Sequence, residues 1–153
     1  MRSLRILVVE DNEADIYYLK TVLDRMGVSY TMQVLGDGEN AVNYLLKRGA
    51  YAKASTPELI FLDLNLPKVS GVEVLEAMPP SRRFPFCILT GSASERDKLK
   101  KKFGIRRIAY VVKPVTREMI LNCFRCYEHL APLAEELSVG GMAQSAAQVP
   151  LER

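Results

Sequence analysis

The sequence predicts an α/β fold, a doubly wound parallel β-sheet with helices on both faces, and three observations support this prediction. Five short apolar runs alternate along the chain with segments in which apolar residues recur at helical spacing. The central run, residues 59–62, is apolar at four consecutive positions, which is typical of a parallel strand buried on both faces. Strands that are joined through helices must run parallel, with right-handed crossovers.

Five strands are expected where the apolar runs stop at polar or turn residues, over residues 4–9, 30–35, 59–62, 86–89 and 108–112. For such a (βα)5 chain we expect the flavodoxin-like strand order 2-1-3-4-5. That order makes the first and third strands neighbours. Open α/β sheets bind ligands beyond the carboxyl ends of such strands, at the point where the strand order reverses.

Five helices are expected to follow these strands. Their ranges are 16–26, 41–49, 71–78, 94–104 and a last helix that begins near Thr116. Gly27 is a natural stop for the first helix, and Ser94 with Asp97 three residues later predicts the N-cap of the fourth. Pro132 is expected to end or kink the fifth helix.

The length of 153 residues suits one domain with a sizeable core. We expect residues 1–137 to form this domain. Residues 138–153 are rich in Gly, Ala, Gln and Ser without an amphipathic pattern, so a disordered tail is expected there.

The composition also indicates the cellular compartment and argues against two classes of partner. The net charge of +3 is too small to indicate nucleic acid, and no apolar run approaches the ~20 residues of a membrane span. The N-terminus passes almost directly into a strand, so it does not resemble a signal peptide. Three cysteines, an odd number at low density, suit a reducing compartment. We therefore expect a cytoplasmic protein with neither a membrane nor a nucleic acid as its partner.

Polar side chains gather where four of the predicted strands end, at Glu10, Asp11, Asp63, Thr90 and Lys113. Each of these alone has an ordinary explanation, such as a helix cap or a turn. Their joint occurrence at the carboxyl ends of strands in one sheet instead predicts a common site. Carboxylates that crowd together repel one another unless a hard cation lies among them, and oxygen ligands suit Mg²⁺.

Asp63 is the expected centre of this site. A carboxylate at the end of a buried strand is unfavourable unless it meets water, a metal or a cation. Lys113 supplies a positive charge and Thr90 a hydroxyl, so the pocket suits a phosphoryl group carried by Asp63. Attack of an aspartate on a phosphoryl donor gives an acyl phosphate, which is a recognised form of nucleophilic catalysis.

The motif around Asp63, residues 62–67 (LDLNLP) followed by Gly71, identifies a family. Over residues 4–130 the chain resembles the receiver domain of two-component response regulators. The resemblance implies that Asp63 accepts a phosphoryl group from a sensor histidine kinase, with Mg²⁺ as cofactor. It further implies that Asp11 is a direct Mg²⁺ ligand, that Glu10 is the partner acid, often acting through water, and that the backbone carbonyl of Asn65 is the third protein ligand.

The resemblance also assigns the switch residues. Thr90 matches the hydroxyl switch residue and Lys113 the lysine that binds the phosphoryl group. Tyr110 matches the aromatic residue whose ring turns inward when the threonine engages that group. The peptide bond before Pro114 is cis in this family, a form that is accessible before proline.

Residues 9–16 (VEDNEADI), with the long loop around residues 49–51, resemble the single-domain regulators paired with bacterial phytochrome kinases. Two departures from the family pattern are modest. Glu10 replaces the commoner aspartate, and the short link over residues 79–83 predicts a clipped third helix. Neither change removes a reactive group.

We therefore expect a stand-alone response regulator rather than a turnover enzyme, which signals through the face formed by the fourth helix, fifth strand and fifth helix. The alternative is a pseudo-receiver that is never phosphorylated and acts as a binding or dimerisation module. An aspartate-nucleophile phosphatase is disfavoured because Asn65 stands where the second acid is needed. A flavodoxin-like electron carrier is disfavoured because Glu10 and Asp11 repel a phosphate after the first strand.

Partner surfaces are expected on two helices. Ile16 and Tyr17 lie near the site and are candidates for kinase docking, although core packing explains Ile16 equally well. A basic run, formed by Lys98, Lys100, Lys101, Lys102, Arg106 and Arg107, reads as a solvated face or a surface for an acidic protein. The downstream partner is not identified, and a homodimer is expected through the fifth strand and fifth helix.

Cys123 and Cys126 have the spacing of a redox pair. Such pairs normally open a helix after a strand, whereas this one lies within the fifth helix, so packing is the expected role. His129, the only histidine, is expected to be a solvated residue at a helix end.

Overall fold

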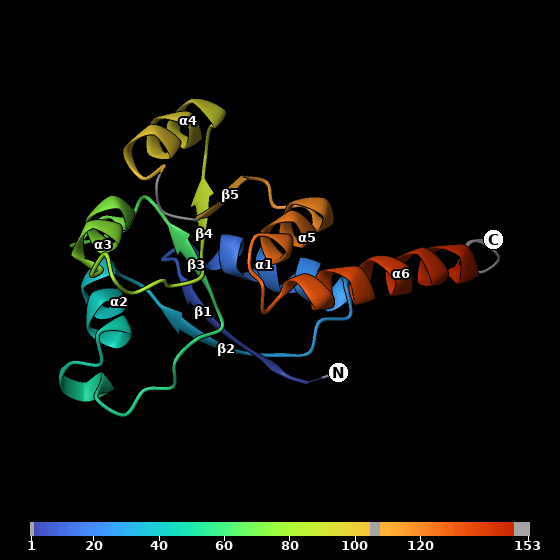
Figure 1. Cartoon of the computed structure of the whole chain (residues 1–153), viewed down its shortest axis with the longest axis horizontal. Coiled ribbons are helices and arrows are strands. Elements are labelled where there is room, and N and C mark those ends of the chain that lie inside the picture. The colour runs from blue at the N-terminus through green and yellow to red at the C-terminus, as the bar shows by residue number, and fades with distance from the viewer. Residues whose placement is uncertain (1, 105–107, 149–153) are drawn as a thin grey trace.

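Five parallel strands form one sheet in the order β2-β1-β3-β4-β5, which confirms the predicted topology (Figure 1). The computed structural model describes residues 2–104 and 108–148. The strands are β1 (Leu4–Val9), β2 (Tyr30–Leu35), β3 (Leu59–Asp63), β4 (Phe86–Thr90) and β5 (Ala109–Val112). The pairing places Val9 beside Leu62 and Asp63 beside Leu89, so the carboxyl ends of the strands share one edge of the sheet.

Six α-helices and one 3₁₀ helix are described around this sheet. They are α1 (Glu13–Arg25), α2 (Gly38–Leu45), η1 (Gly49–Tyr51), α3 (Gly71–Ala77), α4 (Ala93–Lys102), α5 (Arg117–Arg125) and α6 (Ala131–Gln148). The third helix is clipped as predicted, since α3 has seven residues and ends before Pro79. Among the described residues, no helix is both long and apolar enough to cross a membrane.

Two apolar cores lie on opposite faces of the sheet because successive side chains of a strand point to opposite sides. Leu59 and Phe61 of β3 pack with α1, α5 and the start of α6, whereas Ile60 and Leu62 pack with α2, α3 and α4. This explains why β3 is apolar at every position before Asp63. Figure 1 shows α1 and α5 together on one face, with α2 and α3 on the other.

The loop that follows Asp63 is held against the start of α2. The backbone N–H of Gly38 donates to the carbonyl of Pro67 at 3.4 Å. A Cβ atom on Gly38 would lie 1.8 Å from the carbonyl oxygen of Val69, and one on Gly71 would lie 2.5 Å from that of Asp63. Glycine is required at both positions because the backbones approach too closely for a side chain.

The N-cap of α4 lies two residues earlier than predicted. Ser92, not Ser94, has the extended backbone of a cap, and its side chain accepts a hydrogen bond from the N–H of Glu95 at 3.1 Å. Thr90 ends the preceding strand only two residues before, so the helix begins as soon as the chain leaves the sheet. Ser94 lies inside the first turn.

Replacing Ser92 with alanine is expected to lower the free energy of unfolding by about 1 kcal/mol, because an N–H of the first turn loses its acceptor. Urea denaturation of Ser92→Ala and of a control variant, Ser94→Ala, measures this loss of stability. Ser94→Ala is the matched control and is expected to change stability little, since alanine is favourable inside a helix. Equal losses for both variants would contradict the assignment of Ser92 as the cap.

The C-terminal region differs from the prediction. A disordered tail was expected from Ser138, but α6 continues to Gln148; residues 149–153 lie outside the described part of the chain. Pro132 lies in the first turn of α6, where its missing N–H is not needed. Ala134 and Leu137 are buried against α5, and the Arg117 guanidinium donates to the carbonyl of Leu137 at 2.8 Å. Packing on α5 therefore stabilises a helix whose apolar pattern is weak.

Candidate functional site

The candidate site lies at the carboxyl edge of the sheet, and the strands position its side chains. Glu10 directly follows β1, and its N–H donates to the carbonyl of Leu35 at 3.0 Å. Asp63 and Thr90 are the last residues of β3 and β4. The N–H of Lys113, just after β5, donates to the carbonyl of Thr90 at 2.8 Å. The predicted convergence of these strand ends is observed.

The Lys113 ammonium lies among three carboxylates. Its Nζ is 2.6 Å from Oδ2 of Asp63, 2.8 Å from Oδ2 of Asp15 and 3.1 Å from Oε2 of Glu10. The side chains of Glu10 and Asp63 are 2% and 7% exposed, whereas those of Lys113 and Asp15 are 26% and 43% exposed. Two buried carboxylates thus share one partly exposed cation.

The two buried carboxylates have the same hydrogen-bonding arrangement. Oε1 of Glu10 accepts from the N–H of Asn12 at 3.0 Å, and Oδ1 of Asp63 accepts from the N–H of Asn65 at 2.8 Å. In each residue the other oxygen contacts Lys113. Backbone amides on both loops therefore fix the orientation of the carboxylates toward the ammonium.

The pKa values of the two carboxyl groups move in opposite directions. Burial, together with the neighbouring Asp63, raises the pKa of Glu10 from 4.5 to about 7. Burial also acts to raise the pKa of Asp63, but hydrogen bonds from Glu10, Lys113 and the Asn65 backbone outweigh it and lower the pKa. Burial acts to lower the pKa of Lys113, but its bonds to Asp15, Asp63 and Glu10 raise it. Asp63 is therefore the more readily ionised member of the pair.

Thr90 lies at the same edge of the sheet as Asp63, but its hydroxyl is bonded to α4 and not to Asp63. Its buried hydroxyl donates to the carboxylate of Glu95 in the first turn of α4. Tyr110, the other predicted switch residue, is partly buried on the face of α2, α3 and α4, with the Lys100 Nζ 5.9 Å from its ring centroid. The two predicted switch residues thus both contact side chains of α4.

The predicted metal ligands are only partly brought together. Among the described residues, the acidic group whose ligand atoms all lie within 4.8 Å of one another consists of Glu10, Asp15 and Asp63. Asp11 is exposed and is not part of this group. The Asn65 backbone adjoins Asp63, and its side chain is exposed. The predicted cis bond at Lys113–Pro114 is observed.

Sequence reasoning missed Asp15. It lies in the first turn of α1, and Asn12 is the N-cap that accepts from its N–H at 3.0 Å. Leu19, one helical turn later, is buried in the core. Residues four apart share a face of a helix. That spacing was the available signal that Asp15 lies on the side of α1 that faces the sheet.

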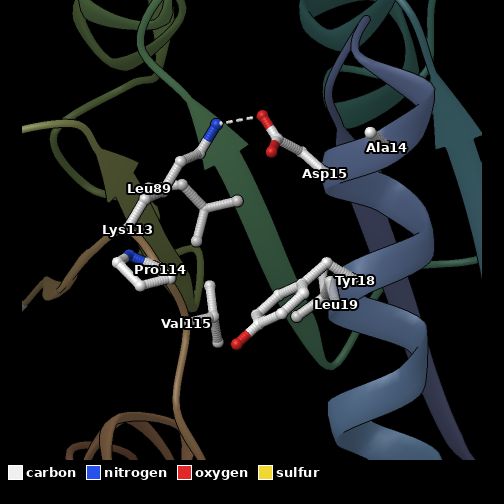
Figure 2. A pocket seen from close by; sticks show the side chains of 8 residues that line it. All are labelled: Ala14, Asp15, Tyr18, Leu19, Leu89, Lys113, Pro114 and Val115. Atoms are coloured by element: carbon white, nitrogen blue, oxygen red, sulfur yellow. Dashed lines mark hydrogen bonds and ion pairs between the residues drawn. The ribbon is translucent and has the colours of Figure 1, made fainter.

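A cavity of about 440 Å³ adjoins the site between α1 and the segment that follows β5. Figure 2 shows Asp15 and Lys113 pointing toward one another across it. The other lining residues are Ala14, Tyr18, Leu19, Leu89, Pro114 and Val115.

The two residues predicted for kinase docking differ in exposure. Tyr17, on α1, is 74% exposed, whereas Ile16 packs partly against the core.

The remaining sequence candidates lie outside the site. Cys123 is buried and Cys126 is partly buried on the α5 side, in keeping with packing. His129 is exposed, and its Nε2 lies 2.8 Å from the carbonyl oxygen of Glu58. The four lysines of the basic run are exposed on α4, with Lys102 paired to Glu76 at 3.0 Å; the two arginines lie outside the described residues.

A family model, the response regulator receiver domain, matches residues 6–125, most of the sheet and the helices up to α5. The chain belongs to this family. Receiver domains are signalling modules of two-component systems. The fold, the strand order and the position of Asp63 at the end of β3 agree with this membership.

The proteins similar to this receiver domain include one response regulator found by sequence and two solved structures that are phytochrome response regulators by name. The response regulator Rcp1 of Synechocystis sp. is 40% identical over 95 residues, covering 60% of this chain and 65% of Rcp1. The bacteriophytochrome response regulator AtBRR has 33% identity and a TM-score of 0.71, covering 82% of this chain and 93% of AtBRR. The phosphorylated cyanobacterial phytochrome response regulator RcpA has 32% identity and a TM-score of 0.62, covering 89% of each chain.

A solved structure of Rcp1 is its Mn²⁺-bound form, with 30% identity, a TM-score of 0.61 and coverage of 97% of this chain and 95% of that one. By sequence, the match spans just under two thirds of Rcp1. It spans 47–48% of the longer transcriptional regulators PhoP of Bacillus subtilis and SphR of Synechococcus elongatus.

Proposed function

We propose that this receiver accepts a phosphoryl group from the phosphohistidine of a sensor histidine kinase onto Asp63, with Mg²⁺ bound at the site. The observation that supports this most strongly is the environment of Asp63, a buried carboxylate with the Lys113 ammonium 2.6 Å away. A phosphoryl group on Asp63 would bring further negative charge to a place where a cation is already held. The names of RcpA and AtBRR support a phytochrome-type kinase as the donor.

The residues present fit Mg²⁺. All candidate donors are oxygen atoms, as this ion prefers, and an ammonium already occupies the space between carboxylates. Glu10, Asp63 and the backbone carbonyl of Asn65 would hold the ion, with Asp11 as a direct ligand through its exposed side chain. When bound, Mg²⁺ supplies positive charge that offsets the charge on the transferred oxygens. The Mn²⁺-bound form of Rcp1 supports such a site in this family.

Transfer is a displacement at phosphorus. A carboxylate oxygen of Asp63 forms the new bond to phosphorus as the bond from phosphorus to the donor histidine nitrogen breaks, and the electron pair of that bond stays on the imidazole. The lowered pKa of Asp63 keeps it ionised for this attack. Lys113 pairs with the phosphoryl oxygens, so the protein contributes chiefly position and charge.

Signalling would require Thr90 to leave Glu95. The Thr90 hydroxyl would then turn to the phosphoryl group, and Tyr110 would turn inward behind it. Phosphorylation thereby favours one of two pre-existing arrangements and reshapes the surface of α4, β5 and α5. The exposed lysines of α4 lie on that surface and suit an acidic downstream protein.

The proposal extends to partners and location. Tyr17 is the better kinase contact of the two predicted docking residues, because it is exposed while Ile16 packs partly on the core. A homodimer through β5 and α5 remains our proposal for the assembly. A cytoplasmic location is supported by the free thiols of Cys87, Cys123 and Cys126.

Incubation with acetyl phosphate tests the reaction directly. We expect intact-protein mass spectrometry to show one phosphoryl adduct that forms with Mg²⁺ and disappears when Mg²⁺ is chelated. If folded protein forms no adduct with this donor, transfer from a phosphorylated histidine kinase is measured next. Failure of both reactions would contradict the proposal and favour a pseudo-receiver that acts by binding alone.

A further inference from the structure

Asp15 is the one carboxylate at Lys113 that the proposed reaction does not use. Its Oδ2 lies 2.8 Å from the Lys113 Nζ, within 0.2 Å of the distance from that atom to Asp63. Unlike Glu10 and Asp63, Asp15 comes from a helix and not from a strand end. It contacts Lys113 from α1, and its side chain, 43% exposed, is the most exposed of the three carboxylates around the ammonium.

The position of Asp15 is well fixed. The Asn12 side chain caps the turn that carries it, and Leu19 of the same face is buried in the core. An aspartate has a short side chain with few rotamers, so a fixed backbone leaves its carboxylate little freedom. Lys113, by contrast, has a long side chain that loses much rotamer freedom when it is held in one place.

Apart from the three carboxylates, the cavity residues around the Lys113 ammonium offer few groups with which it could pair. Below it the cavity is lined by apolar side chains, including Leu89 and Val115 (Figure 2). On its inner side are Glu10 and Asp63, which become metal ligands in the proposed reaction. Asp15 is then the carboxylate that still faces the ammonium.

We propose that Asp15 is a positioning residue that holds the Lys113 ammonium beside Asp63 while Glu10 and Asp63 bind the metal. The proposal rests on the proposed phosphoryl transfer and adds to it a residue on α1. Asp15 acts through Lys113 and contacts neither the phosphoryl group nor the metal.

The test compares Asp15→Asn with the wild-type protein. We expect the rate of phosphorylation by acetyl phosphate to fall roughly threefold to tenfold, the range that loss of a partly exposed ion pair allows. The affinity for Mg²⁺, measured by titration without a phosphoryl donor, is expected to stay within about twofold of wild type. Glu13→Gln is the matched control because it removes the same charge from an exposed residue in the same helical turn.

A double-mutant cycle in the metal-free protein tests the contact itself. We expect Asp15→Asn to lower the free energy of unfolding when Lys113 is present and to have no such effect in a Lys113→Met background. This readout does not depend on activity. Equal effects of Asp15→Asn in both backgrounds would contradict the proposed contact.

The outcomes separate this inference from the proposed function. If the wild-type protein is phosphorylated and Asp15→Asn reacts at the same rate, the proposed role of Asp15 is contradicted, whereas the proposed function is not. A large loss of Mg²⁺ affinity in Asp15→Asn would also overturn it, because Asp15 would then be a metal ligand. Failure of the wild-type protein to take a phosphoryl group from either donor would contradict both.

Discussion

Asp63→Asn is expected to abolish the phosphoryl adduct formed with acetyl phosphate and Mg²⁺. The amide that replaces the carboxylate is a poor nucleophile, and no other carboxylate of the cluster ends a strand beside an ammonium at 2.6 Å. We expect the substitution to leave the fold intact, because asparagine has nearly the same shape and its carbonyl oxygen can accept from the N–H of Asn65. Intact-protein mass spectrometry gives the adduct, and urea denaturation verifies folding.

Asp97→Asn is a suitable control for this experiment. Asp97 is exposed on α4, where it pairs with Arg96 at 3.3 Å, and we expect the variant to be phosphorylated as the wild type is. An adduct that persists in Asp63→Asn and maps to another residue by peptide mass spectrometry would show that the acceptor lies elsewhere. A variant that does not fold would be replaced by Asp63→Glu, which keeps the charge and displaces the reactive oxygen.

The metal-free protein is expected to become less stable as the pH rises from about 4.5 to about 7. Glu10 has a pKa of about 7 in the folded protein and 4.5 as its ordinary value. Between these values the folded state binds a proton that the unfolded state releases. The stabilisation is therefore complete at lower pH and is lost as the pH rises through about 7. The shift sets a ceiling of about 3 kcal/mol on this effect.

Urea denaturation at a series of pH values in the presence of a chelator measures this loss. Glu10→Gln is expected to remove it, so the difference between wild type and variant isolates Glu10 from the other titrating groups. Asp63 has the opposite sign, but its lowered pKa confines its contribution to pH values below its ordinary 3.8. A wild-type slope that Glu10→Gln leaves unchanged would contradict the shifted pKa. Mg²⁺ is expected to reverse the slope, because it binds the ionised carboxylates.

The sheet could be predicted from the sequence because four of its five strands have two signals, an apolar run and the residues at which that run stops. The apolar run of β3 is bounded by Pro57 and Pro67, and those of β1, β4 and β5 stop at polar residues that themselves belong to the site. The residues expected at strand ends, Glu10, Asp63, Thr90 and Lys113, lie at one edge because parallel topology brings carboxyl ends together.

What the sequence did not reveal depends on contacts between elements. Asp15 is one acid among several on a helix, and only the packing of α1 shows that it faces Lys113. Glu95 could not be distinguished from other first-turn acids by sequence. In the structure Ser92 is the N-cap of α4, which places Glu95 at the Thr90 hydroxyl. The helix α6 has little amphipathic pattern of its own, and its first turns are fixed by α5 through Arg117 and Leu137.

The close approach of Gly38 to Val69 has a mechanical consequence. The segment that carries Asn65 leads directly to Pro67 and Val69, and these lie against the first turn of α2 with no room for even a methyl group. Packed backbones of this kind do not slide past one another freely. Any displacement of the segment after Asp63 would therefore be shared by α2, so motion that begins at Asp63 reaches the first turn of this helix through direct contact of the two backbones.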